Sequence, residues 1–440
     1  MTLEPTQAPA GDEPTQAGNY FVSNYPPYSF WNQAQVADAL SLFKQPPAVQ
    51  SPLGIYVHIP FCRKRCHFCY FKVYTDKNAA EVESYLDSLI RELATYSTMP
   101  FLGGRKPVFI YFGGGTPSYI STTQLGRLVG EMKRLLPWDE AQEVAFECEP
   151  GTITEGKLRL IREFGITRIS LGIENFDDAI LEANGRAHRS REIGPAFAMA
   201  RSLGFPQINV DLISGMVGET TENWRECVRR TIEMSPDSVT IYQMEVPYNT
   251  TLFKLHGQNV TPVAGWAAKR EWVRYAFAEM EKAGYTVCSA YTAVKDPDRT
   301  KFLYRDLLWA GADMLGLGVA SFSHVQGTHF QNEHDLAAYQ ARVARGELPL
   351  LRALTPTCEE RMIREFVLQM KLGRVATGYF RRKFGVAIEE RFAGPLDKLQ
   401  GRGLLSVADG EILLSRDGLL QVDGLLPEFF NPEHRVSRKV

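Results

Sequence analysis

The stretch Gly54-Ile-Tyr-Val-His-Ile-Pro-Phe-Cys62-Arg-Lys-Arg-Cys66-His-Phe-Cys69 runs from a short apolar strand directly into a loop with three cysteines. Their C-x3-C-x2-C spacing brings three thiols into one loop, where they can converge on one metal centre. A [4Fe–4S] cluster normally takes four cysteines. Three ligands leave one iron open to an exogenous group, whereas a structural zinc site would need His67 or a distant side chain as its fourth ligand. The spacing alone leaves both interpretations open.

Further β-rich runs follow this first strand and alternate with amphipathic stretches. The runs are 107–112, 143–147, 168–173, 208–213 and 238–243, and the amphipathic stretches include 81–96, 122–136, 191–203 and 222–234. This alternation predicts an α/β fold in which a parallel sheet, buried on both faces, is covered by helices. Periodicity does not decide whether the sheet closes as a barrel. In either case ligands gather at the carboxyl ends of the strands.

The two ends of the chain differ from the middle in composition and in the pattern of apolar residues. Residues 1–18 contain the segment EPTQA twice and predict a disordered tail. A helix at 266–283 and a strand at 287–292 extend the alternating region, which we place at 51–350. Residues 351–440 combine helical patterns with a short hairpin at 403–414, which predicts a small α+β, winged-helix-like domain. DNA binding is not favoured, because such folds also serve as structural lids.

Composition limits the classes of partner. The 440 residues carry 49 basic and 51 acidic side chains, a net charge of −2, so wholesale electrostatic capture by nucleic acid or an anionic membrane is not expected. The seven cysteines, an odd number with three crowded together, do not suggest a disulfide framework. No run approaches 18 apolar residues, and the first residues do not resemble a secretory signal. These features predict a cytoplasmic protein.

A glycine-rich segment, Gly113-Gly-Gly-Thr-Pro117, follows the second predicted strand. Glycines at the carboxyl end of a strand let the backbone approach a ligand closely and offer it N–H and C=O groups. Many tight turns look alike, so the run is weak evidence by itself. Its expected position beside the cysteine loop makes a ligand shared by the two segments plausible.

Together these residues resemble the radical S-adenosylmethionine (SAM) superfamily, and more closely its oxygen-independent coproporphyrinogen III oxidase (HemN-like) family. The resemblance spans roughly residues 50–425 and excludes the zinc interpretation for practical purposes. It is carried by Tyr-Val-His-Ile-Pro-Phe-Cys at 56–62, Glu-Cys-Glu-Pro at 147–150, Arg-Ile-Ser-Leu-Gly-Ile-Glu-Asn-Phe at 168–176, Gly-Arg-Ala-His at 185–188, Asn-Val-Asp-Leu-Ile-Ser-Gly at 209–215 and Gly-Leu-Gly-Val-Ala-Ser-Phe-Ser at 316–323.

The resemblance implies a partial (β/α)6 barrel with an N-terminal arm at 19–50 and a HemN-like C-terminal domain. It implies a [4Fe–4S] cluster on Cys62, Cys66 and Cys69, with SAM bound to the open iron. One electron, from a flavodoxin- or ferredoxin-type donor, would cleave SAM to methionine and a 5′-deoxyadenosyl radical. The protein would supply position, electron delivery and exclusion of water.

HemN-like enzymes are similar in binding a second SAM beside the first. By motif matching, the residues around the first SAM are Tyr56, Gly114, Glu147 and Phe322, and those around the second are Phe68, Gly115, Thr116, Glu174, Arg186, Asp211 and Met244. Carboxylates suit ribose hydroxyls and an ammonium group, and arginine suits a carboxylate. Structural ion pairs for Arg186 and Asp211, and a core position for Phe322, are the alternatives. The sequence identifies no further catalytic residue.

Two departures from the family pattern bear on the reaction. Coproporphyrinogen oxidases of this family carry another cysteine where this chain has Phe71, and their second SAM site usually shows glutamine where this chain has Glu174. Both departures argue against decarboxylation of a haem precursor, and the HemN-like motifs without a cysteine at position 71 favour the family's methyltransferase and cyclopropanase branch.

Our leading hypothesis is therefore C-methylation or methylene transfer, from a second SAM to an unsaturated small molecule. The alternatives are oxidative decarboxylation of coproporphyrinogen III, a tetrapyrrole, and non-catalytic haem binding or delivery. Tyr242, Gln243 and Glu245 are candidates for lining the substrate space, with ordinary packing as the alternative for each.

Overall fold

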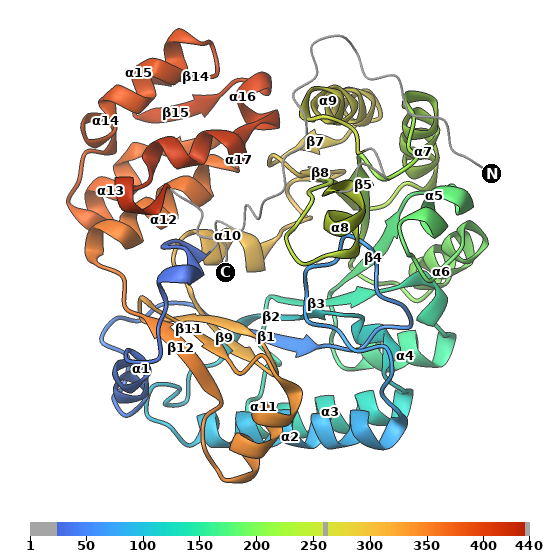
Figure 1. Ribbon diagram of the computed structural model, residues 1–440, viewed down its shortest axis with the longest axis vertical. Helices are drawn as coiled ribbons and strands as arrows, with labels where there is room; N and C mark the ends of the chain where they lie inside the picture. The colour runs from blue at the N-terminus through green and yellow to red at the C-terminus, as the bar shows by residue number, and fades with distance from the viewer. Residues whose placement is uncertain (1–23, 258–262, 436–440) are drawn as a thin grey trace.

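The computed structural model describes residues 24–257 and 263–435 (Figure 1). The predicted tail at 1–18 and the start of the predicted arm at 19–50 lie outside these residues. Within the described residues, no helix is long and apolar enough to cross a membrane.

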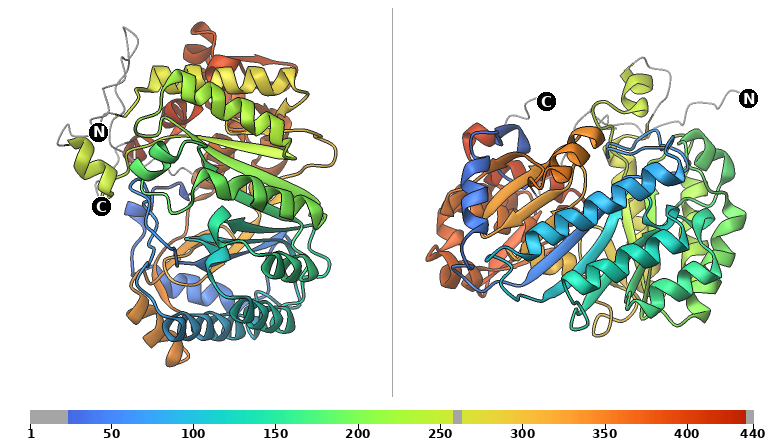
Figure 2. Two further views of the ribbon diagram at one scale, coloured as in Figure 1. Left: turned by 90° about the vertical axis from the view of Figure 1, so that its right-hand side faces the viewer. Right: turned by 90° about the horizontal axis from the view of Figure 1, so that it is seen from below.

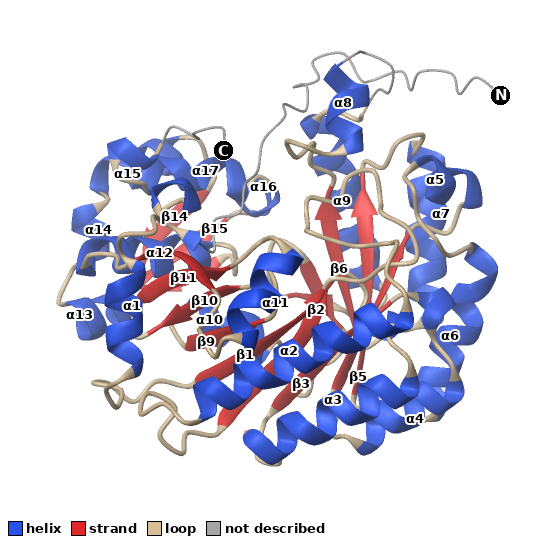
Figure 3. Cartoon of the chain, turned by 60° about the horizontal axis from the view of Figure 1, so that its bottom comes forward, coloured by secondary structure: helices blue, strands red, loops and turns tan. Residues whose placement is uncertain are grey.

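Six parallel strands form the centre of the molecule, with helices packed on their outer face (Figure 3). The strands are β1 (Leu53–Ile59), β2 (Pro107–Gly114), β3 (Glu143–Cys148), β4 (Arg168–Glu174), β5 (Gln207–Ser214) and β6 (Ser238–Gln243), and they pair in that order. The connecting helices are α2 (Ala79–Ser97), α3 (Thr122–Leu135), α4 (Glu155–Glu163), α5 (Asp178–Ala183), α6 (Ser190–Ser202) and α7 (Thr221–Met234). The predicted α/β fold with a parallel central sheet is confirmed.

Local sequence explains where these elements begin. The strands are buried along nearly their whole length, which explains their apolar, β-branched composition. Helix α2 begins at a capping box in which Asn78 and Glu81 bond each other's backbone N–H groups, and α3 begins at the equivalent pair Ser121 and Gln124. Side chains of the inner helix faces and the strands form one continuous apolar core.

Both edges of the parallel region are extended, giving a twelve-stranded sheet. Beside β1 lie the parallel β9 (Asp313–Leu317) and then the antiparallel β10 (Phe322–Val325), β11 (Thr328–Asn332) and β12 (Leu350–Leu354). Beside β6 lie β8 (Thr292–Val294) and β7 (Thr286–Val287), also antiparallel. The remaining helices of this part are α1 (Val36–Phe43), α8 (Thr251–Gly257), α9 (Trp266–Lys282), α10 (Leu303–Trp309) and α11 (Leu336–Ala344).

The single strand predicted at 287–292 is wrong. The segment is a hairpin, because the Ser289 hydroxyl accepts hydrogen bonds from the backbone N–H groups of Tyr291 (3.2 Å) and Thr292 (3.1 Å). A serine side chain that bonds the backbone two and three residues ahead turns the chain and competes with strand geometry.

A buried polar network holds the turn between β9 and β10. Glu92 of α2 accepts hydrogen bonds from the Gly318 N–H (2.8 Å), the Asn332 amide (2.6 Å) and the Tyr339 hydroxyl (2.6 Å). Burial raises the pKa of Glu92 to about 7. Gly318 has φ +99°, a conformation that favours glycine. The Gly-Leu-Gly motif at 316–318 therefore has a structural role in placing the start of β10.

The C-terminal part combines helices with a small antiparallel sheet and lies beside the barrel in Figures 1 and 2. Its elements are α12 (Cys358–Met370), β13 (Arg374–Ala376), α13 (Thr377–Phe384), α14 (Ile388–Arg391), α15 (Ala393–Gly401), β14 (Leu405–Ala408), β15 (Glu411–Leu414), α16 (Arg416–Leu420) and α17 (Val422–Leu425). The sheet order is β13-β15-β14, and this part has its own apolar core. The α+β prediction is confirmed, and the exact boundary at 350/351 stays a prediction.

Candidate functional site

The cysteine loop leaves the carboxyl end of β1 and is tied back to it by backbone hydrogen bonds. The Tyr74 N–H bonds the Pro60 carbonyl (2.7 Å), and the Cys62 N–H bonds the Tyr74 carbonyl (3.1 Å). All three cysteines are partly buried free thiols. Burial raises the pKa of Cys62 to about 11 and that of Cys69 to about 12, and the neighbouring thiols add to each shift.

The glycine segment after β2 packs directly against this loop. The Gly115 N–H donates to the Ile59 carbonyl (2.8 Å) and the Thr116 N–H to the Phe61 carbonyl (2.8 Å). A Cβ on Gly115 would lie 2.8–2.9 Å from the Ile59 and Phe61 carbonyl oxygens, closer than real Cβ contacts allow. Gly115 is thus required for close approach to the chain's own backbone. At Gly114, with φ +110°, a Cβ would meet the His58 ring.

Two hydrogen-bond donors point at cysteine sulfurs. The Thr116 hydroxyl donates to the Cys62 Sγ (3.4 Å), and the Arg186 Nη1 donates to the Cys66 Sγ (3.4 Å). Arg186 Nη2 donates to the Gly172 carbonyl (2.6 Å), and its buried Nε has no partner. Donors aimed at sulfur favour thiolates over neutral thiols, so this donor set fits an anionic cysteine-ligated centre. Among the described residues, no three histidine, cysteine or carboxylate side chains are already gathered at metal-binding distances.

Two partly buried carboxyl groups lie at the inner face of the strands. Glu147 of β3 accepts from the Tyr111 hydroxyl (2.7 Å) and the Gly114 N–H (3.3 Å), and burial raises its pKa to about 7. Asp211 of β5 accepts from Ser170 Oγ (2.7 Å) and from Asn209 Nδ2 (2.8 Å), and burial raises its pKa as well. Both remain acceptors for hydroxyl or ammonium donors.

Glu174 ends β4 in a strained conformation beside Arg186. Its φ of +64° is unusual for a residue with a side chain, and the β4–β5 register shifts between Gly172 and Glu174. Its carboxylate lies 3.5 Å from Arg186 Nη2. Burial raises the pKa of Glu174 to about 7, although Arg186 opposes the shift. The strand thus aims this carboxyl group inward at the cost of local strain.

The apolar and aromatic residues that the sequence analysis proposed for SAM binding lie in different parts of the structure. The Tyr56 hydroxyl shares a hydrogen bond with His58 Nδ1 (3.1 Å), and the Tyr56 ring stacks on Tyr111. Phe68 packs against the apolar cluster that contains Met244. Phe322, on β10, meets the Trp31 ring edge-on at a centroid distance of 5.6 Å. Phe322 is the candidate that contacts the segment preceding β1.

Three inner side chains were not singled out by the sequence analysis. Arg168, which opens β4, is buried, pairs with Glu143 (2.7 Å) and lies near the Tyr111 ring. The Tyr111 and Tyr304 rings contact each other at 4.5 Å. The signal that could have drawn attention to Arg168 is a charged residue at the start of an otherwise apolar strand. Tyr111 cannot be told from a core aromatic residue in the sequence.

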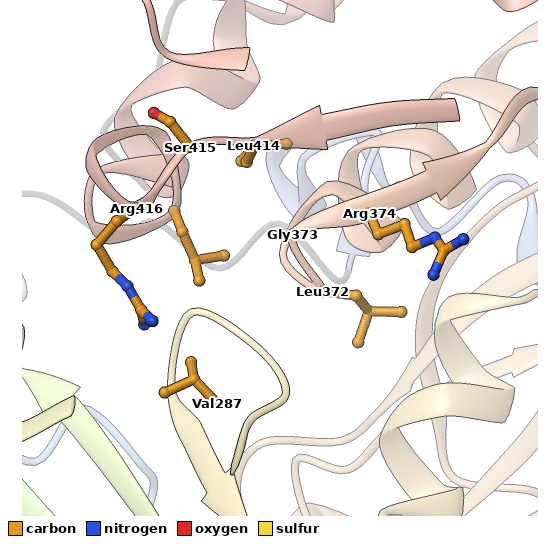
Figure 4. Close-up of a pocket in the computed structure, with 8 residues that line it drawn as sticks. Val287, Leu372, Gly373, Arg374, Leu414, Ser415 and Arg416 are labelled. Atoms are coloured by element: carbon orange, nitrogen blue, oxygen red, sulfur yellow. The ribbon is translucent and has the colours of Figure 1, made fainter. Parts of the chain in front are cut away.

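A hollow of about 330 Å³ lies away from the cysteine loop, between β7 and the C-terminal sheet (Figure 4). It contains none of the predicted site residues. Its two arginines are both engaged, Arg416 with Glu281 and Arg374 with Glu411. Its lining residues are Val287, Leu372, Gly373, Arg374, Leu414, Ser415, Arg416 and Leu419.

The sequence from residue 56 to 231 matches the family model of the radical SAM superfamily. This chain carries a radical SAM domain. It is 26% identical over 367 residues to the heme chaperone HemW of Bacillus subtilis (strain 168), with 83% of this chain and 96% of the relative covered. It is 26% identical over 425 residues to the oxygen-independent coproporphyrinogen III oxidase of Synechocystis sp., with 90% of this chain and 89% of the relative covered.

The structure of coproporphyrinogen III oxidase (HemN) from Escherichia coli superposes with a TM-score of 0.80 and 22% identity, covering 95% of this chain and 99% of that one. This likeness establishes the fold of the whole described chain. The chain contains a radical SAM domain and is similar to HemN-type proteins over most of its length, and its cofactors are a [4Fe–4S] cluster and SAM. The HemN-like resemblance is confirmed, whereas the relatives named above are coproporphyrinogen oxidases or a heme chaperone and do not support the methyltransferase branch.

Replacing Gly115 by alanine tests the contact between the glycine segment and the cysteine loop. We expect a loss of about 1–3 kcal/mol in unfolding free energy, because the new methyl group overpacks against backbone, and a lower iron content after reconstitution. Denaturant titration and iron analysis measure both. Gly130→Ala, in the exposed face of α3 with open space around its Cβ, is the control and should be neutral or slightly stabilising. Equal behaviour of the two variants would contradict the assignment.

Replacing Thr116 by valine removes the donor to Cys62 while keeping the shape of the side chain. A hydrogen bond to a thiolate stabilises the more negative, reduced cluster, so its loss lowers the potential. One hydrogen bond is worth about 1 kcal/mol, which sets an upper limit of about 40 mV for a one-electron couple. A redox titration followed by electron paramagnetic resonance measures the shift. Thr116→Ser retains the hydroxyl and should keep the wild-type potential; a shift equal to that of valine would refute the role.

Proposed function

We propose that this protein is a radical SAM oxidoreductase that decarboxylates propionate side chains of a porphyrinogen of the coproporphyrinogen III type. The observation that carries the proposal is the extent of the similarity to the Synechocystis oxidase, which covers 90% of this chain and 89% of the relative. The match therefore includes the barrel and the C-terminal part together. Each propionate would lose one hydrogen atom to the 5′-deoxyadenosyl radical, one electron to a one-electron acceptor and CO2, and would become a vinyl group.

When bound, the cluster and SAM supply a 5′-deoxyadenosyl radical, which abstracts a hydrogen atom from the substrate. We assign Cys62, Cys66 and Cys69 as the three cluster ligands. Thr116 and Arg186 stabilise two of the thiolates through their hydrogen bonds. A flavodoxin- or ferredoxin-type protein would deliver the electron.

We assign the inner carboxyl groups to SAM binding. Glu147 and Asp211 accept hydrogen bonds from ribose hydroxyls or from the ammonium group, because their low-dielectric surroundings strengthen such bonds. Arg186 is placed to pair with a SAM carboxylate while its Nη1 remains on Cys66. These donors and acceptors are consistent with two bound SAM molecules, of which the second lies beside Glu174.

Methyl or methylene transfer is the second candidate, and two residues favour it. Phe71 replaces the additional cysteine of the oxidases with a ring that is 40% exposed. Glu174 places an acidic group where the family pattern has an amide. A carboxylate beside a second SAM would attract its cationic sulfonium and so favour binding of the second SAM that methyl transfer consumes.

A single anaerobic assay separates the candidates. Reconstituted protein is mixed with reductant, SAM and coproporphyrinogen III, and the products are counted by mass spectrometry. We expect CO2, vinyl-bearing porphyrinogen and 5′-deoxyadenosine without S-adenosylhomocysteine. Stoichiometric S-adenosylhomocysteine would support methyl transfer instead, and tight haem binding without product would support a HemW-like role. Cys66→Ala, which removes one cluster ligand, is the inactive control.

Glu174 gives the site a predicted pH dependence. Since burial raises its pKa from the usual 4.5 to about 7, Glu174 is mostly neutral at pH 6 and mostly anionic at pH 8. Its charged surroundings are Arg186, Asp211 and Glu147. An anionic partner binds the cationic SAM more tightly than a neutral one, so affinity for the second SAM should rise, by about tenfold, across this window.

Calorimetric titration of cluster-loaded protein with SAM at pH 6, 7 and 8 measures this effect. In Glu174→Gln the part of the rise that comes from Glu174 should disappear, and the part that comes from Glu147 should remain. The comparison isolates Glu174, because Glu147 titrates in both proteins. Glu226→Gln, on the exposed face of α7, should behave like the wild type. A Glu174→Gln variant that keeps the full pH dependence would exclude contact with SAM.

A further inference from the structure

His67, in the middle of the cysteine loop, is bonded through its backbone and its ring to segments that follow other strands. Its N–H donates to the Asn184 carbonyl (3.0 Å), and its own carbonyl accepts from the Leu252 N–H (2.8 Å). The ring Nδ1 lies 3.0 Å from the Ala183 carbonyl oxygen. Since a carbonyl oxygen only accepts, Nδ1 carries the proton in this contact. The contact gives a reason for a histidine among the cysteines that involves no metal.

The turn at the end of α5 packs directly against the cysteine loop. Gly185, with φ +75°, lies in this turn. A Cβ on Gly185 would lie 2.8 Å from Cδ2 of the His67 ring and 3.1 Å from the Arg65 carbonyl oxygen. The next residue, Arg186, donates to the Cys66 Sγ (3.4 Å). The conformation of this turn therefore sets both the position of the loop and the direction of the donor to sulfur.

The side chain of Asn184 fixes the turn to the segment that follows β5. Its amide Nδ2 donates to the carbonyls of Ile180 (2.8 Å) and Val217 (3.0 Å), and its Oδ1 accepts from the Val217 N–H (3.1 Å). Asn184 is 1% exposed. Loss of this amide would leave buried backbone groups without partners, which is costly. Asn184 thus joins three segments, the cysteine loop through its carbonyl and the other two through its side chain.

The segment after β5 is in turn held by a buried carboxyl group, that of Glu219. It accepts hydrogen bonds from the N–H groups of Gly215 (2.5 Å) and Met216 (3.3 Å), and from the Asn175 amide (2.8 Å). Asn175 directly follows Glu174 in the chain. The segments that hold the cysteine loop are therefore also bonded to the end of β4, where Glu174 lies.

We propose that His67 and Asn184 are positioning residues that fix the cysteine loop to the segments following β4 and β5; we name the pair the His67–Asn184 clamp. The clamp keeps the turn at 184–186 against the loop and thereby keeps the Arg186 donor on Cys66. A donor on a ligand sulfur tunes a metal centre without touching the metal. The proposal rests on the proposed function only in taking Cys66 as a cluster ligand.

The first measurement is amide hydrogen exchange of the peptide 62–69 in the full chain before the cluster is reconstituted. His67→Phe keeps a ring without the donor, whereas His67→Asn keeps an N–H at the same number of bonds from the backbone as Nδ1. Asn184→Leu keeps the approximate volume and removes the amide. Gln207→Met is the control, because it removes a buried amide that bonds Ser238 Oγ (3.2 Å) at the opposite, amino end of β5.

We expect exchange in this peptide to become about fivefold faster in His67→Phe and in Asn184→Leu, the effect of losing one hydrogen bond. His67→Asn and Gln207→Met should stay within about twofold of the wild type. Wild-type exchange in both His67→Phe and Asn184→Leu would overturn the proposal. So would equal acceleration in Gln207→Met, which would indicate general destabilisation. If Asn184→Leu does not fold, the two His67 variants decide.

The second measurement is the redox potential of the reconstituted cluster, followed by electron paramagnetic resonance. His67→Phe and Asn184→Leu should lower the potential, because the donor from Arg186 to the Cys66 sulfur is displaced. His67→Asn and Gln207→Met should keep the wild-type value, and an unchanged potential in all four variants would refute the role of the clamp. Neither measurement involves decarboxylation, so failure of the proposed reaction in its own assay leaves the clamp to be decided by exchange and potential.

Discussion

The hydrogen bonds from Gly115 and Thr116 to the carbonyls of Ile59 and Phe61 are the constraint on which the site depends. They continue the pairing of β1 with β2 beyond the ends of both strands, into the two loops that carry the chemistry. Because this pairing admits no Cβ at position 115, the cysteine loop and the glycine segment are fixed relative to each other. The Thr116 hydroxyl reaches Cys62 as a consequence of that register.

The charged side chains inside the barrel also depend on one another. Besides burial, Asp211 raises the pKa of Glu147, and Asp211 and Glu147 both raise that of Glu174, where Arg186 opposes the shift. Arg186 also donates to Cys66, so one guanidinium connects the cluster loop with the acidic interior. A change in the charge of either region therefore alters the electrostatic potential at the other through this side chain.

The parallel strands could be predicted from sequence because two-sided burial produces apolar runs that need no knowledge of partners. Strand β9 could not, since it pairs with β1 across more than 250 residues, and its Gly-Leu-Gly pattern gives no local strand signal. The spacing of Cys62, Cys66 and Cys69 predicted that one loop carries three thiols, and the structure has three free cysteines in the loop after β1, while their role as cluster ligands stays a prediction. The contacts of Arg168 with Glu143 and Tyr111, and of Tyr111 with Tyr304, were not predictable, because they arise where β2, β3, β4 and α10 meet in space.

Phe71 limits the proton transfer that is available beside the cysteine loop. A phenyl ring carries no transferable proton, so any proton or hydrogen atom delivered near the cysteine loop has to come from a neighbouring group. Tyr70, stacked on Phe71, is such a group. Burial raises its pKa, so at neutral pH the phenol is protonated and acts as a donor, not as a base. The mouth of the barrel therefore combines apolar ring faces with a neutral donor, above an interior that holds acidic acceptors.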